Sequence, residues 1–180
     1  MRALGPGSVS SFLKTVLDVV YYGTAVILAL LTLGLVAGLL AISFFPDLFR
    51  EIAERLKIEG EVSPGRLAAL GVILAVYGML YLGALIAILS RLRKVFATLT
   101  AGDPFQPDNI PRLRLIGFVL AGMELTRYAL GALLLAIAPV LSWEIDGFNI
   151  TVWFSVLVVF VLAEVFREGA RLRREAELTI

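Results

Sequence analysis

Residues 16–45 read VLDVVYYGTAVILALLTLGLVAGLLAISFF, and Asp18 is the only charged residue among them. A helix needs about 20 mostly apolar residues to cross about 30 Å of hydrocarbon, because it rises about 1.5 Å per residue. The apolar region of a secretory signal is shorter, at about 7 to 15 residues. This stretch therefore predicts a first membrane-spanning helix that is not cleaved.

Three further stretches have the same character, at about residues 67–90, 115–141 and 150–166. The whole chain of 180 residues is 59% hydrophobic, with a mean hydropathy of +0.93. Such a composition is too apolar for a soluble domain. In lipid a helix satisfies its own backbone hydrogen bonds, whereas an isolated strand does not. We expect an all-α fold, a four-helix transmembrane bundle that forms one domain over residues 1–180.

The distribution of lysine and arginine predicts the orientation, since cytoplasmic loops retain these residues. Eleven of them lie before the first span, in the loop 91–114 and in the tail 167–180, against four between the first two spans. Both termini are therefore expected in the cytoplasm. In the first outer loop, apolar residues recur at steps of three and four from Phe45 to Leu56, which predicts a short amphipathic helix at the membrane interface.

The composition also excludes several chemistries. The chain has no cysteine and no histidine, which removes thiolate nucleophiles, serine–histidine catalysis and the usual zinc sites. Its formal net charge is only +1, so no overall field favours nucleic acid. We expect a protein that is not an enzyme, holds no metal or cofactor and does not bind nucleic acid directly.

A few polar residues lie within the predicted spans. Glu124 and Arg127 are three residues apart on the third helix, so their side chains can meet on one face. Charges in hydrocarbon are costly unless paired, which predicts that this face points into the bundle. We expect one polar cluster in the inner half of the bundle, formed by Asp18, Tyr22, Glu124, Arg127, Tyr128 and Glu164. A structural pair that fixes helix register and a ligand, ion or proton site both remain open.

Basic residues gather in the loop and in the tail: Arg91, Arg93, Lys94, Arg112, Arg114, Arg171, Arg173 and Arg174. They can contact anionic lipid head groups or a cytoplasmic partner. Gly34 and Gly38 form a GxxxG motif in the first span, which is typical of close helix packing within one chain or in a homo-oligomer.

Two groups of residues carry a family resemblance. The first is Leu92-Arg93-Lys94-Val95-Phe96 followed by Gly102, Pro104-Phe105, Asn109-Ile110 and Arg112-Leu113-Arg114. The second is Val165-Phe166-Arg167-Glu168-Gly169 followed by Leu172, Glu175 and Glu177-Leu178-Thr179-Ile180. With these residues the second half of the chain resembles the bacterial membrane family known as domain of unknown function 2975.

The resemblance implies four spans in the bacterial inner membrane, cytoplasmic termini and no known enzymatic activity. It also implies a partner, because members are often encoded beside a small helix-turn-helix regulator. The hypothesis from the sequence is a non-enzymatic membrane protein that regulates or scaffolds a cytoplasmic partner. The alternative is a small oligomeric transporter or channel that uses Glu124 and Arg127.

Overall fold

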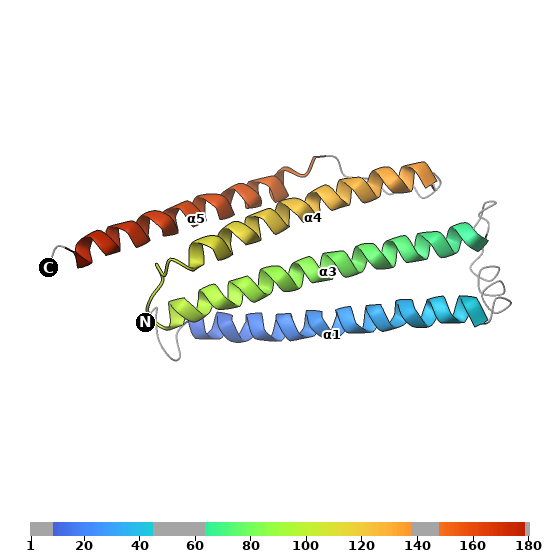
Figure 1. The fold of residues 1–180 in the computed structure, drawn as a ribbon, viewed down its shortest axis with the longest axis horizontal. Coiled ribbons are helices and arrows are strands. Elements are labelled where there is room, and N and C mark those ends of the chain that lie inside the picture. Colours follow the sequence, from blue (N-terminus) through green and yellow to red (C-terminus); the bar gives the residue numbers. More distant parts are fainter. Residues whose placement is uncertain (1–8, 45–63, 138–147, 179–180) are drawn as a thin grey trace. The chain divides into compact units, whose positions relative to one another are not determined.

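The computed structural model describes residues 9–44, 64–137 and 148–178, and the chain there forms four long helices (Figure 1). They are α1 (Val9–Phe44), α3 (Pro64–Thr100), α4 (Asn109–Ile137) and α5 (Ile150–Glu177). Each contains an apolar segment long enough to cross a membrane. The prediction of an all-helical, multi-pass membrane protein with four spans is confirmed. The predicted interfacial helix after Phe45 lies outside the described residues, and the orientation stays a prediction.

Two helices extend beyond the predicted spans at their charged ends. The helix α3 continues to Thr100 and α5 continues to Glu177, because both sequences retain good helix formers after the apolar segment ends. The stop after α3 depends on Gly102, whose φ of 82° is the left-handed conformation that glycine adopts without strain. The connection between α3 and α4 is thus only residues 101–108. This agrees with the sequence, which predicts that the second helix runs past the membrane to a stop near Gly102 and that Asp108 or Asn109 caps the third.

The chain divides into two compact units, residues 23–83 and residues 1–22 with 84–180. In the first unit, the Leu31 side chain lies so close to Gly78 that an added Cβ would come within 3.1 Å of it. Gly34 and Gly38 instead line an apolar groove of about 400 Å³ together with Gly71 and Ala75. Both glycines of the GxxxG motif therefore face open space in the described part of the chain.

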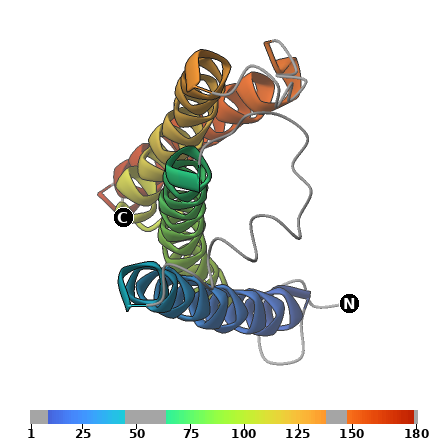
Figure 2. The ribbon, with the colours of Figure 1, turned by 90° about the vertical axis from the view of Figure 1, so that its right-hand side faces the viewer.

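The second unit has its core where three helices meet. Leu113 and Ile116 of α4 and Ala163 of α5 are buried, and partly buried Ile88 and Leu92 of α3 pack against them. The helices α4 and α5 run antiparallel and side by side, as both views show (Figures 1 and 2). They approach closely because residue 117 is a glycine, where an added Cβ would lie 2.9 Å from the Phe160 ring.

Candidate functional site

The connection between α3 and α4 is fixed by the side chain of Asn109, which is 0% exposed. Its amide donates hydrogen bonds to the Thr98 hydroxyl at 2.7 Å and to the Pro104 carbonyl at 3.1 Å. Its oxygen accepts a hydrogen bond of 2.9 Å from the Arg112 guanidinium. A buried amide must satisfy its donors and acceptor, so these bonds hold the end of α3, the turn and the start of α4 in one arrangement.

The same turn packs against the charged end of α5. The Phe105 ring lies 5.7 Å from the Phe166 ring, centroid to centroid. It also covers the backbone of Gly169 so closely that an added Cβ there would be 2.5 Å from the ring. Asp103 forms an ion pair with Arg173, which also bonds Glu177 at 3.0 Å. We call residues 98–112 together with residues 166–177 the loop–tail junction.

The contacts of the loop–tail junction use only one face of the tail. At about 3.6 residues per turn, Phe166, Gly169, Arg173 and Glu177 fall on the face that meets the turn. The opposite face carries Glu168, Arg171, Leu172 and Glu175. Arg171 pairs there with Glu168 and, at 3.8 Å, with Glu175. Leu172 is 54% exposed between these charges. The tail thus presents an ordered outer face of alternating charges with an exposed leucine.

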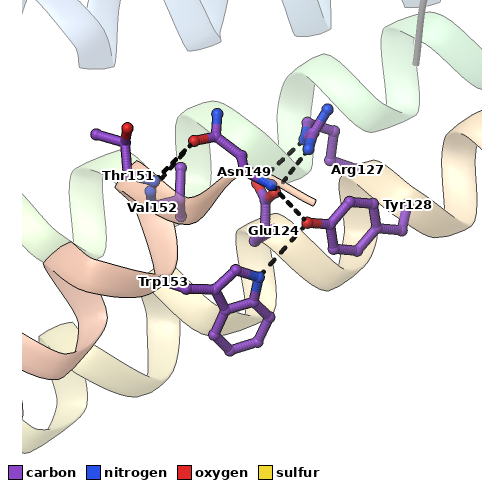
Figure 3. Close-up of polar contacts among 7 residues, drawn as sticks. All are labelled: Glu124, Arg127, Tyr128, Asn149, Thr151, Val152 and Trp153. Atoms are coloured by element: carbon purple, nitrogen blue, oxygen red, sulfur yellow. Dashed lines mark hydrogen bonds and ion pairs between the residues drawn. The ribbon is translucent and has the colours of Figure 1, made fainter. Parts of the chain in front are cut away.

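The second polar site lies between α4 and the first turn of α5 (Figure 3). Glu124 is 4% exposed and accepts two hydrogen bonds from Arg127, at 2.6 and 3.0 Å. The Arg127 guanidinium carbon also lies 4.8 Å from the centre of the Tyr128 ring. This bidentate geometry is the strong form of an ion pair between arginine and a carboxylate. The local spacing of three residues therefore gives the pair that the sequence predicted.

Tyr128 connects the pair to the start of α5. Its hydroxyl accepts hydrogen bonds from the backbone N–H of Asn149 at 3.3 Å and from the Trp153 indole at 3.4 Å (Figure 3). The Asn149 side chain in turn accepts the backbone N–H groups of Thr151 and Val152 and caps the helix. The pair is thus level with the first turn of α5, whose apolar segment begins there.

The structure does not bring the six predicted residues into one cluster. Asp18 pairs with Arg93 of α3, whose guanidinium lies over the Tyr21 and Tyr22 rings at 4.5 and 5.2 Å. Glu164 pairs with Arg167 and, at 4.0 Å, with Arg114. Arg114 precedes Glu124 by ten residues, about 15 Å along α4.

Antiparallel packing is the reason for this separation, because Glu164 and the pair of Glu124 and Arg127 lie near opposite ends of the apolar segment of α5. Lys14 lies one helical turn before Asp18, so sequence spacing alone predicts it as a possible partner. The structure instead supplies Arg93, which the sequence assigned to lipid or partner contact.

The predicted basic residues divide by partner. Arg112 pairs with Asp108 at 3.5 Å, and Arg171 and Arg173 are paired as described above. Within residues 9–44, 64–137 and 148–178, the structure gives no ion-pair partner to Arg91, Lys94 or Arg174. In the same ranges no three acidic side chains are grouped so that they could hold a metal ion.

Comparison with known protein families gives a match over more than half of the chain. The model of the family described as protein of unknown function (DUF2975) matches residues 58–180. The chain belongs to this family. The match covers α3, α4 and α5 entirely, which extends the resemblance seen in the second half of the sequence to all of α3. No curated protein and no solved structure matches the chain.

The residues that carried the DUF2975 resemblance meet in space at the loop–tail junction. Phe105 from the first group lies against Phe166 and Gly169 from the second, and Asn109 holds the turn that carries Phe105 through its bond to Pro104. The sequence identifies these residues as motif members and gives no role to Phe105. Asn109 follows Asp103-Pro104 and Gln106-Pro107, which break the helix, so the sequence predicts it as a possible cap of the next helix. Its complete burial depends on contacts that spacing alone does not show.

Proposed function

We propose that this DUF2975 protein is a non-enzymatic membrane regulator or scaffold that holds a cytoplasmic partner on the outer face of its α5 tail. The loop–tail junction carries the proposal, because one face of the tail is anchored to the turn and the other is left ordered and exposed. The family resemblance makes a small helix-turn-helix regulator the partner to test first.

The chemistry of the outer face supports a protein partner. The side chains of Glu168, Arg171 and Glu175 are 49%, 62% and 59% exposed, yet they hold one another along the helix. A surface ordered in advance loses less conformational entropy when a partner binds. Leu172 and Leu178, 54% and 82% exposed, offer apolar contacts between and beyond the charges. An alternating charged face with apolar points of contact is typical of a specific, reversible protein interface.

The test is co-purification of the full chain with the neighbouring regulator after co-expression in membranes. Removal of the tail after Gly169 should reduce capture more than tenfold. The point variant Leu172→Glu should reduce it about tenfold, since it places a carboxylate between Glu168 and Glu175. Leu13→Glu makes the same substitution at an exposed position of α1, outside the junction, and should leave capture unchanged. Equal capture by the tail-deleted protein and the full chain would rule out the proposal.

A small oligomeric transporter or channel is the second candidate, and the pair of Glu124 and Arg127 is the observation that favours it. Charges in the apolar part of a span commonly mark an ion or proton path. The bidentate bonds between the two side chains count against this role, because each partner already satisfies the other. Replacing both with glutamine should abolish ion or solute flux in liposomes if the pair transports, and should leave partner capture intact if it is structural.

A further inference from the structure

The charged and apolar parts of α4 and α5 meet at one level. From Leu115 to Met123, α4 has no charged residue, and α5 has none from Ile150 to Ala163. The first charges beyond these segments are Arg114 and Glu164, which lie 4.0 Å apart. Since both helices change character at the same contact, this level corresponds to the boundary between hydrocarbon and head groups.

Two arginines share a single carboxylate at this boundary. Arg167 bonds one oxygen of Glu164 directly, whereas the nearest Arg114 nitrogen lies 4.0 Å from the other oxygen. The Arg114 and Arg167 side chains are 48% and 58% exposed. A guanidinium has five N–H donors in a planar fork, so one shared carboxylate cannot engage all the donors of both arginines. The three groups together carry one positive charge in excess.

An aromatic surface lies one turn into the apolar side of these charges. Phe118 follows Arg114 by four residues on α4, and Phe160 precedes Glu164 by four residues on α5, so each ring shares a face with a boundary charge. The two rings meet edge to face at 5.1 Å. Phe118 is 65% exposed although it lies beside a helix contact. The two rings thus form an apolar surface directly next to the excess positive charge of Arg114, Arg167 and Glu164.

We propose that Arg114 and Arg167 bind the phosphate of an anionic phospholipid whose acyl chain lies on Phe118 and Phe160. One phosphodiester neutralises the excess charge of the site, and the guanidinium forks match its oxygens. The exposed Phe118 ring is what selects a lipid over a soluble phosphate, since only a lipid brings an acyl chain to that position. A net negative head group such as that of phosphatidylglycerol fits, because a zwitterionic lipid would leave the site charged.

The experiment is native mass spectrometry of the full chain in mild detergent, titrated with phosphatidylglycerol, phosphatidylcholine or soluble glycerol phosphate. Phosphatidylglycerol should bind at least fivefold more tightly than phosphatidylcholine. Arg114→Gln and Arg167→Gln should each weaken its binding about fivefold. The matched control is Arg171→Gln, which removes the same charge one turn further along α5 and should weaken binding less than twofold.

Two further variants should change lipid binding in opposite directions. Glu164→Gln should tighten phosphatidylglycerol binding about fivefold, because the carboxylate no longer competes for the arginines. Phe118→Ala should weaken lipid binding and leave glycerol phosphate binding unchanged. Equal affinity for the two lipids, equal loss in Arg171→Gln and Arg114→Gln, or full competition by glycerol phosphate would each overturn the proposal. Circular dichroism of each variant verifies that the helices are intact.

Discussion

The pair of Glu124 and Arg127 and the loop–tail junction both join acids to arginines, yet they are built on opposite principles. In the pair the partners are three residues apart on one helix, and the carboxylate is 4% exposed. In the junction Asp103 and Arg173 are 70 residues apart, and their side chains are 40% and 50% exposed. The pair is local and buried, whereas the junction is long-range and partly solvated.

The two regions are stabilised by different kinds of interaction. A buried pair cannot lose one member without leaving a charge in a medium that solvates it poorly. The ion pair of the junction can lose one member at little cost, because water solvates the charge that is left. The junction therefore depends on its apolar and backbone contacts, namely the Phe105 ring on Gly169 and the buried amide of Asn109. Substitutions in the two regions should separate these sources.

The largest effect is expected from Glu124→Ala. It leaves Arg127 within an apolar segment with its bidentate partner removed, so the midpoint of thermal unfolding in detergent should fall by about 10 °C. The matched control is Glu164→Ala, which breaks a pair of the same spacing whose carboxylate is 54% exposed. That midpoint should change by about 2 °C or less.

A double variant tests whether the pair is needed for stability or only costly to break. Glu124→Leu with Arg127→Leu removes both charges and should recover most of the midpoint lost in Glu124→Ala, since an apolar replacement needs no partner. If Glu124→Ala and Glu164→Ala have equal midpoints, burial does not distinguish the two pairs. Burial of the carboxylate would then not be what makes the pair of Glu124 and Arg127 costly to break.

The same contrast explains what the sequence could predict. The four spans follow from apolar length, the glycine at residue 102 from turn chemistry, and the pair of Glu124 and Arg127 from a three-residue spacing. All of these are local properties. Arg93 as the partner of Asp18, and Phe105 as the cover of Gly169, join different helices, so they depend on the register between elements that spacing within one element does not encode.

The error in the predicted cluster has the same origin. The sequence places Asp18 and Glu164 near the charged ends of their helices and Glu124 and Arg127 deeper, with all four in the inner half of the bundle. The contact of Tyr128 with Asn149 instead places the start of α5 beside the middle of α4. Glu124, Arg127 and Tyr128 therefore lie near the start of α5, whereas Glu164 lies beyond the other end of its apolar segment.

An intermediate effect is expected from Gly169→Val, which tests the apolar part of the junction. The Phe105 ring occupies the space that the new Cβ needs, so ring and tail must separate. This overpacking should cost about 2 kcal/mol and speed amide hydrogen exchange in residues 103–108 and 170–177. Gly122→Val is the matched control, a helical glycine with nothing within 4 Å of an added Cβ. Unchanged exchange in Gly169→Val would show that the ring contact does not anchor the tail.

The smallest effect is expected from the ion pair between Asp103 and Arg173. Asp103→Asn removes one of the two acids at Arg173 but leaves Glu177 bonded to it, and the site is open to solvent. The unfolding midpoint should fall by about 1 °C, and Arg173→Gln should fall slightly further because it loses both acids. The double variant should match Arg173→Gln, since the lost pair is counted only once. If the midpoint of Asp103→Asn fell as far as that of Gly169→Val, the ion pair and not the apolar contact would hold the tail to the turn.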